Sequence, residues 1–315
     1  MRLDDFDPDV IDVEDQRGGN FGGLGGGGLP LGLGGGRLGC GTLVIVVIAA
    51  LVFGVNPLQL VGSLDQGGGT QVGGALPGQG AGQRGLPGET RRAGTTVTEI
   101  CSVDEASRDS CQALSSLNKT WEPIFRAANL PFQRPRLVFY SQNGQSGCGA
   151  AQSAMGPFYC PSDNGIYLDT DFYRELEQRF GASGDFARDY VIAHEYGHHI
   201  QNLLGLSEQV HRLQQRAGDE ATANRLSVRL ELQADCYAGV WAAKNASRIE
   251  PGDLQEGLTA AHQIGDDTLM KGAGRRPMED AFTHGSSAQR MEWLKRGIES
   301  GNEDTCDTFA DLKRR

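Results

Sequence analysis

Two histidines and a glutamate stand out because their spacing suits metal chemistry. They are His194, Glu195 and His198. Four residues along a helix make one turn, so both imidazoles would lie on one face and reach the same metal ion. Glu195 would lie beside them, where its carboxylate can polarise a metal-bound water. By chance this H-E-x-x-H spacing arises in about one chain in a hundred of this length. It predicts a zinc site with Glu195 as general base.

A catalytic zinc takes three protein ligands and leaves one position open. An extended pattern that supplies a third histidine is absent, because Gln201 and Leu204 occupy the positions that would need Gly and His. A second helical stretch, residues 224–243, carries Glu231 and Asp235 four residues apart. We expect Glu231 to be the third ligand and Asp235 to accept the N–H of a ligand histidine. The alternative is an ordinary acidic pair on a helix surface.

These side chains require helices that hold them. Residues 185–204 show apolar positions at helical spacing, with Ser183 and Asp185 available to cap the start. Gly197 lowers helix propensity by about 1 kcal/mol relative to alanine, so we expect close packing to require it. His199 points away from the other two histidines and is interpreted as a core or rim residue.

Two further features could serve a peptide substrate. His284 follows the metal-binding stretches on a predicted loop, where it could stabilise an oxyanion; the alternative is a surface histidine. Residues 147–169 alternate short apolar runs with Gly and Pro. They could supply an edge strand along which a peptide adds by backbone hydrogen bonds, with residues 150–153 as the docking edge. His211 and His262 have no partner at ligand spacing and are assigned no role.

The N-terminal third differs in composition from the rest. Residues 1–37 are acidic and then glycine-rich, and are predicted to be a disordered cytoplasmic tail. Residues 38–61 lack charge and are mostly aliphatic, which predicts a transmembrane helix, the alternative being a buried core helix. Residues 62–95 are predicted to be a flexible linker, and residues 96–315 one catalytic domain.

Charge and cysteine content bear on location. Arg17 and Arg37 precede the apolar stretch, which predicts a cytoplasmic N-terminus and a periplasmic or extracellular domain on a single-pass anchor. The net charge of −11 argues against a nucleic-acid partner. Six cysteines in the domain suit an oxidising compartment. Fifteen pairings are possible; close spacing favours Cys101 with Cys111 and Cys148 with Cys160, which leaves Cys236 with Cys306. The alternative is six buried free thiols.

Taken together, residues 121–309 resemble the bacterial neutral zinc metallopeptidases that carry one N-terminal membrane helix, within the gluzincin group. The resemblance is carried by these segments: 147–161, 166–169, 185–201, 225–241, 264–267 and 282–290. It implies a zincin-like α+β fold, a zinc ion held by His194, His198 and Glu231, and Glu195 as the catalytic base. It also implies that the substrate is a peptide or protein.

Three functions remain open at this point. The first is hydrolysis of peptide bonds by a membrane-anchored endopeptidase. The second is a membrane-tethered binding or scaffold module that keeps zinc without hydrolysis, although retention of Glu195 counts against it. The third is a zinc hydrolase that acts on non-protein amides such as cell-wall peptides.

Overall fold

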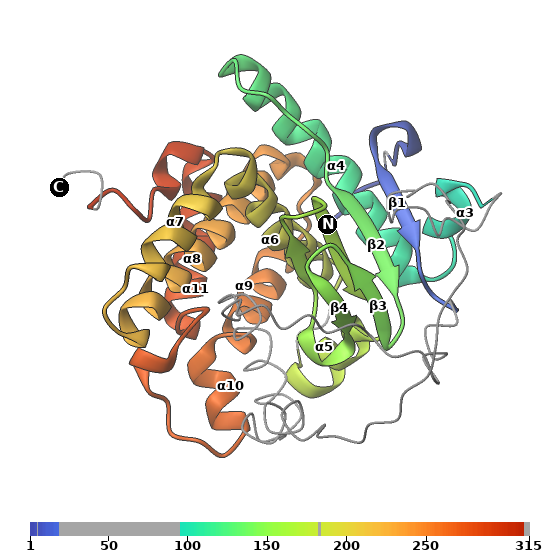
Figure 1. Cartoon of the computed structure of the whole chain (residues 1–315). Helices are drawn as coiled ribbons and strands as arrows, with labels where there is room; N and C mark the ends of the chain where they lie inside the picture. Colours follow the sequence, from blue (N-terminus) through green and yellow to red (C-terminus); the bar gives the residue numbers. More distant parts are fainter. Residues whose placement is uncertain (5, 19–94, 182–183, 312–315) are drawn as a thin grey trace, which may run out of the picture.

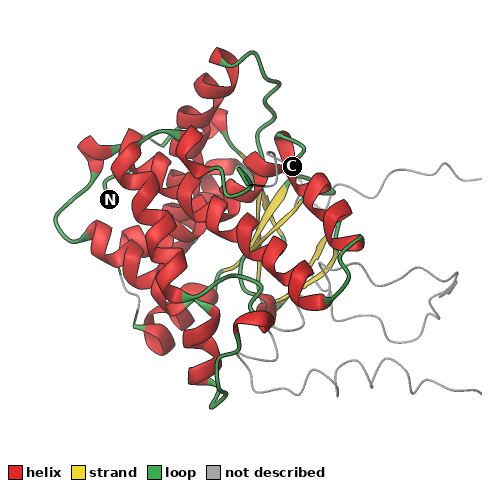
Figure 2. Cartoon of the chain, turned by 90° about the vertical axis from the view of Figure 1, so that its left-hand side faces the viewer, coloured by secondary structure: helices red, strands yellow, loops and turns green. Residues whose placement is uncertain are grey.

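The computed structural model describes residues 1–4, 6–18, 95–181 and 184–311. A mixed sheet lies beside a larger helical part (Figures 1 and 2). The strands are β1 (Asp12–Asp15), β2 (Arg136–Tyr140), β3 (Asn143–Ser146), β4 (Gly149–Gln152), β5 (Phe158–Cys160) and β6 (Gly165–Asp169). The α-helices are α3 (Val97–Cys101), α4 (Glu105–Ala127), α5 (Phe172–Phe180), α6 (Asp185–Leu203), α7 (Leu206–Gln215), α8 (Glu220–Lys244), α9 (Asp253–Gln263), α10 (Asp266–Gly272) and α11 (Ser287–Ser300). Short 3-10 turns are Pro8–Val10, Ser153–Met155, Ala246–Arg248, Glu279–Ala281 and Glu303–Cys306.

The main sheet has the strand order β1-β2-β6-β5. β1 and β6 both pair with β2 in parallel, whereas β5 runs antiparallel to β6 at the edge. β3 and β4 form a separate antiparallel hairpin. The α+β class expected from the sequence is therefore confirmed.

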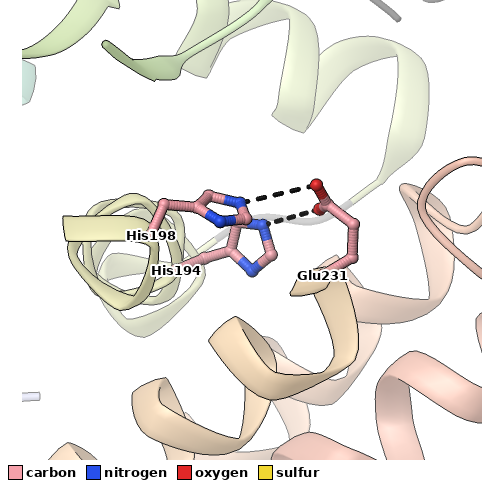
Figure 3. A group of neighbouring side chains, drawn as sticks. All are labelled: His194, His198 and Glu231. Carbon is pink, nitrogen blue, oxygen red and sulfur yellow. Dashed lines mark hydrogen bonds and ion pairs between the residues drawn. The ribbon is translucent and has the colours of Figure 1, made fainter. Parts of the chain in front are cut away.

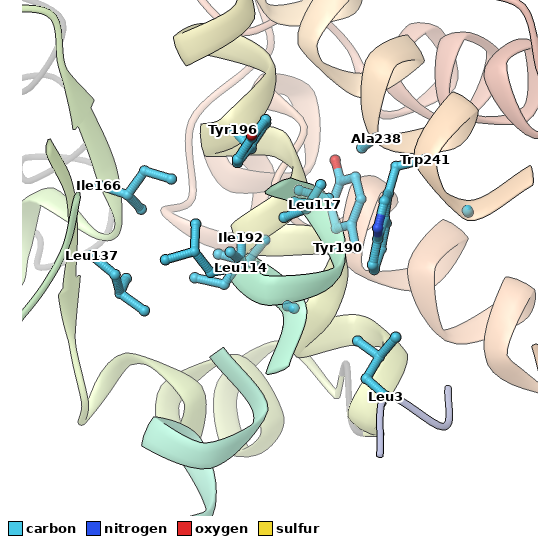
Figure 4. Close-up of a cluster of buried hydrophobic side chains, with 14 of the residues drawn as sticks. Leu3, Leu114, Leu117, Leu137, Ile166, Tyr190, Ile192, Tyr196, Ala238 and Trp241 are labelled. Atoms are coloured by element: carbon cyan, nitrogen blue, oxygen red, sulfur yellow. The ribbon is translucent and has the colours of Figure 1, made fainter. Parts of the chain in front are cut away.

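The hydrophobic core joins the sheet to the helix that carries the histidines. Leu137 of β2 and Ile166 of β6 face Leu114 of α4 and Ile192 of α6 (Figure 4). All four side chains are fully buried. On the far side of α6, Trp241 of α8 extends the same core. α6 is thus enclosed between the sheet and α8, which explains why its sequence is apolar on more than one face.

Helix starts differ slightly from the expectation. α6 begins after Gly184, which has φ of 112° and provides no side-chain cap, and Asp185 lies in its first turn instead. Ser183 lies outside the described residues. α8 begins earlier than predicted, because Asp219 accepts a hydrogen bond from the backbone N–H of Thr222 at 2.7 Å and caps the helix.

The first eighteen residues correct the prediction of a disordered tail over 1–37. Residues 12–15 form β1 and pair with β2 in register, Asp12 opposite Arg136 and Asp15 opposite Phe139. Ile11 and Val13 are buried in the main core. Their burial stabilises the strand in spite of its acidic neighbours, because Asp12 and Glu14 alternate with them and point the other way. Residues 19–37 lie outside the described residues.

The prediction of a single-pass membrane protein is also corrected. In the part of the chain that the structure describes, no helix combines the length and apolar character needed to cross a bilayer. The predicted span, residues 38–61, and the predicted linker as far as residue 94 lie outside that part. In addition, β1 belongs to the same sheet as β2, so a membrane cannot separate residues 1–18 from the domain. The predicted arrangement of a cytoplasmic N-terminus and an extracytoplasmic domain is therefore wrong.

The three expected disulfides are confirmed. They are Cys101–Cys111, Cys148–Cys160 and Cys236–Cys306. The first closes the α3–α4 turn, the second ties the β3–β4 hairpin to β5, and the third fixes the C-terminal segment to α8.

Residues 150–153, predicted to be the edge strand that binds a peptide, do not lie at the edge of the main sheet. Residues 150–152 belong to β4, which pairs with β3 outside the main sheet, and Ser153 starts a 3-10 turn. The edge strand of the main sheet on the α6 side is β5. Any strand addition beside the histidines would therefore involve residues 158–160.

Candidate metal centre

The two helices that carry the candidate ligands approach each other at Gly197. A Cβ atom at this position would lie 2.7 Å from the Cα of Ala234 on α8, which is closer than real side chains come. The expected packing reason for Gly197 is therefore found. α8 meets α11 in the same way, because a Cβ at Gly239 would lie 2.2 Å from the carbonyl oxygen of Leu294. Three helix backbones are thus almost in contact around the site.

This close approach brings His194 and His198 of α6 opposite Glu231 of α8 (Figure 3). Nε2 of His194 lies 3.2 Å from Oε2 of Glu231, and Nε2 of His198 lies 3.5 Å from Oε1. One ligand atom from each of the three residues lies within 4.8 Å of the other two. The three side chains selected from the sequence therefore converge on one point.

The other ring nitrogen of His194 is held by a buried charged network. Its Nδ1 lies 2.8 Å from Oδ1 of Asp235, and since a carboxylate only accepts, Nδ1 carries the hydrogen. Asp235 also accepts from the guanidinium of Arg290 at 2.9 Å and from the hydroxyl of Tyr190 at 2.6 Å. Burial opposes ionisation of Asp235, but Arg290 and His194 lower its pKa to about 2. Asp235 is therefore an ionised acceptor that fixes the tautomer of His194.

His198 is held by a neutral network instead. Its Nδ1 lies 2.9 Å from the side-chain oxygen of Gln201, one turn further along α6. The amide nitrogen of Gln201 donates to the carbonyl oxygen of Leu230 at 2.7 Å and to the side chain of Gln233 at 3.1 Å. These contacts fix which end of the Gln201 amide faces His198. Nδ1 of His198 is consequently the donor, as in His194.

With both Nδ1 atoms engaged, both Nε2 atoms face the Glu231 carboxylate, so positive charge, from protons on the imidazoles or from a metal ion, must lie between them. Burial alone would raise the pKa of Glu231, but the imidazoles of His198 and His284 hold it well below its ordinary value. Burial lowers the pKa of His198, yet Glu231 raises it to about 9. Two imidazoles and one carboxylate are a donor set that suits zinc, and the residues present fit that ion.

Glu195 lies next to the candidate ligands in the sequence and is 8% exposed. Burial raises the pKa of its carboxyl group, while His194 and His198 act in the opposite direction. A buried carboxylate with a raised pKa is a stronger base than an exposed one. This environment suits the role predicted for it.

His284 lies near the same centre, in the loop before α11. Its Nδ1 lies 3.1 Å from Oδ1 of Asp266, and the backbone N–H groups of residues 283–285 donate to the other carboxylate oxygen. Burial lowers the pKa of His284, but Asp266 and Glu231 outweigh it and raise the pKa. The predicted surface alternative is thus not what the structure shows, since the side chain is 12% exposed.

A second group could geometrically hold a metal ion, namely Asp185, Asp253 and Glu256. The α-amino group of Met1 already lies 2.6 Å from Asp185 and 3.1 Å from Asp253. This group consists of carboxylates that face a protein cation, and it lacks the oriented histidines of the first. His211 and His262 do not contribute to either group.

Comparison with known proteins identifies the family. The family described as "Putative neutral zinc metallopeptidase" matches residues 7–309. The chain belongs to this family.

Similar proteins occur in Escherichia coli and Mycobacterium tuberculosis. The chain is 49% identical over 208 residues to the uncharacterized protein YpfJ of Escherichia coli K12, a match that covers 65% of this chain and 72% of YpfJ. It is 43% identical over 213 residues to the uncharacterized protein Rv2575 of Mycobacterium tuberculosis H37Rv, covering 63% and 69% of the two chains. No solved structure matches the chain.

Three residues of the centre were not predicted from the sequence. Arg290 and Tyr190 bind Asp235, and Gln201 orients His198. Arg290 lies within a segment that carried the family resemblance, and a buried Asp235 signals the need for a cation. Gln201 was considered only as a departure from a longer zinc-binding pattern.

Proposed function

We propose that the chain is a zinc-dependent peptidase, with His194, His198 and Glu231 as the metal ligands. The observation that carries the proposal is that the Nε2 atoms of both histidines converge on the Glu231 carboxylate, with both Nδ1 atoms engaged elsewhere. Membership of the zinc metallopeptidase family supports it. Zinc, when bound there, would polarise the substrate carbonyl and lower the pKa of a water molecule.

The chain's own residues account for the proton transfers. Glu195 takes a proton from the attacking water and delivers it to the leaving amine, because it lies beside the ligands in a buried position. His284, oriented by Asp266, donates to the oxyanion that develops on the substrate carbonyl. Its raised pKa favours the protonated form needed for that donation.

A peptide substrate would be aligned by β5. This strand is the antiparallel edge of the main sheet and is fixed to α6, since the hydroxyl of Tyr159 lies 3.0 Å from Nδ1 of His199. The unpaired backbone groups of such an edge bind extended peptides. The expectation that a peptide adds as a strand is therefore transferred from residues 150–153 to residues 158–160.

The test uses the full chain. Elemental analysis should find one zinc per chain, and Glu195→Gln should keep the zinc while hydrolysis of an unfolded protein falls by about 10²–10⁴-fold. His211→Gln provides a control for loss of a histidine outside the centre. A Glu195→Gln variant as active as the parent would disprove the role of this base. Parallel assays with cell-wall peptides separate the two substrate classes, and activity confined to those peptides would contradict protein hydrolysis.

A further inference from the structure

The N-terminal segment, residues 6–18, binds along strand β2 of the domain in the way that a separate peptide binds to the edge of a sheet. β1 adds to the free edge of β2 in parallel, and the backbone N–H of Gln16 donates to the carbonyl oxygen of Phe139 at 2.8 Å. Ile11 and Val13 are buried in the core. The strand thus uses backbone hydrogen bonds for attachment and alternate side chains for recognition.

Polar contacts make the recognition specific along the whole segment. The side-chain amide of Gln16 exchanges two hydrogen bonds with the backbone of Gln145, of 2.9 and 3.0 Å, and so extends β3 as a further strand would. The guanidinium of Arg17 lies over the ring of Phe139 at 4.8 Å and donates to the buried Ser107 at 2.7 Å. Glu14 pairs with Arg136 at 2.9 Å.

A series of hydrogen bonds connects the segment to α6, the helix that carries His194 and His198. The side-chain nitrogen of Asn118, on α4, donates to the carbonyl oxygen of Val10 at 2.8 Å. The side-chain oxygen of the same Asn118 accepts from the hydroxyl of Tyr196 at 2.7 Å. Tyr196 lies between the two ligand histidines in sequence, and both Asn118 and Tyr196 are buried.

We propose that residues 6–18 are an intramolecular peptide ligand whose docking beside β2 holds the metal helix α6 in its metal-binding position. Docking reduces the freedom of α4 and, through Asn118 and Tyr196, that of α6. Displacement of the segment would weaken the metal centre without a change in any ligand. The coupling to metal rests on the proposed function, whereas the docking itself does not. The family match starts at residue 7 and so covers residues 7–18 of this segment.

The experiment starts from the full chain with a site-specific protease sequence inserted between Gln83 and Arg84, outside the described residues. After cleavage, the N-terminal fragment should co-elute with the domain at a ratio of one to one. Val13→Asp should release it, because Val13 is 1% exposed, whereas the matched control Val103→Asp, at 59% exposure, should retain it. Loss of the fragment from a parent domain that stays folded and zinc-loaded would overturn the proposal.

Coupling is then measured by linkage. In competition with a labelled synthetic peptide of residues 1–18, the fragment site should bind the peptide about tenfold more tightly with zinc than with a chelator, because coupling between two binding sites acts in both directions. Tyr196→Phe should retain the fragment but lose most of this zinc effect. Equal peptide affinities with and without zinc in the parent would overturn the coupling. A parent that binds no zinc would instead contradict the proposed function, and co-elution would still decide the docking.

Discussion

His194 and His198 lie one turn apart on α6 and face the same carboxylate, yet they are supported differently. Nδ1 of His194 contacts an ionised Asp235 that is paired with Arg290, with no solvent access to the carboxylate. Nδ1 of His198 contacts the neutral amide of Gln201. The first support is a buried ion pair, and the second is a network of amides and carbonyls.

The difference separates two ways to fix an imidazole. A carboxylate acceptor makes the opposite nitrogen more electron-rich and so a stronger ligand, but it must be compensated in the core by a cation. An amide acceptor fixes orientation with little effect on basicity and needs no counter-charge. Substitution of Asp235, the acceptor of His194, is therefore expected to destabilise the protein more than substitution of Gln201, the acceptor of His198.

The largest effect is expected from Asp235→Asn. This change removes the charge that compensates Arg290, which is 2% exposed, and should lower the free energy of unfolding by about 3–5 kcal/mol. Chemical denaturation measures it. The matched control is Asp189→Asn on α6, a buried carboxyl group whose pKa burial raises well above its ordinary value, so loss of its charge should lower stability less.

A double variant separates stability from metal binding. Asp235→Leu with Arg290→Met removes both charges and should recover most of the lost stability. Zinc affinity should stay about 10–100-fold below that of the parent, because Nδ1 of His194 has lost its acceptor. Full recovery of zinc affinity would show that Asp235 has no role in orienting His194.

Removal of the metal is expected to have the next largest effect. With free zinc at about 100 times its dissociation constant, binding adds about 2.7 kcal/mol to the stability, which corresponds to about 5–10 °C in melting temperature. A chelator should abolish this gain in the parent. His194→Ala and His198→Ala should melt at the same temperature with and without zinc. A zinc-dependent shift in either variant would argue against that histidine as a ligand.

Gln201→Leu tests the neutral support. It leaves Nδ1 of His198 and the carbonyl oxygen of Leu230 without their partner, which should lower the free energy of unfolding by about 2 kcal/mol. Zinc affinity should fall by about tenfold, less than for Asp235→Asn. Gln214→Leu on α7 removes a similar amide contact, to Ser227, and should leave zinc affinity unchanged. An equal loss of affinity in Gln201→Leu and Asp235→Asn would remove the distinction between the two supports.

The smallest effect concerns Asp266, which orients His284 as Asp235 orients His194. Burial favours protonation of Asp266, but His284 and the backbone N–H groups hold its pKa below the ordinary 3.8. A lowered pKa in the folded state stabilises the protein above pH 3.8, and this contribution is lost as the pH falls through the folded pKa. The difference in stability between parent and Asp266→Asn should therefore shrink below pH 3.8. A difference that stays constant from pH 6 to pH 3 would contradict this assignment.

Sequence reasoning was most successful where contacts are local. His194, Glu195 and His198 occupy one helical turn, and Glu231 and Asp235 another, so spacing alone places each set on one face. Arg290 could not be placed in the same way, because it reaches Asp235 from a helix 55 residues further along the chain. Only the packing of α11 against α8 brings the two together.

The N-terminal strand shows the opposite difficulty. Ile11 and Val13 alternate with Asp12 and Glu14, a period of two, but the run is four residues long and lies in an acidic surrounding. Its partner, β2, begins at Arg136, so the pairing depends on a contact distant in sequence. Composition indicated disorder, whereas burial of the alternate residues determines the structure.

The close contact of helix backbones at Gly197 and Gly239 has a consequence for ion selectivity. Because α6, α8 and α11 cannot move closer and are enclosed by the core, the distances among the side chains of His194, His198 and Glu231 are largely set by the helices themselves. Zinc bonds to nitrogen and oxygen at about 2.0–2.2 Å, whereas Ca²⁺ requires about 2.3–2.6 Å and more oxygen ligands. Fixed distances among these three side chains would therefore favour zinc over the larger Ca²⁺.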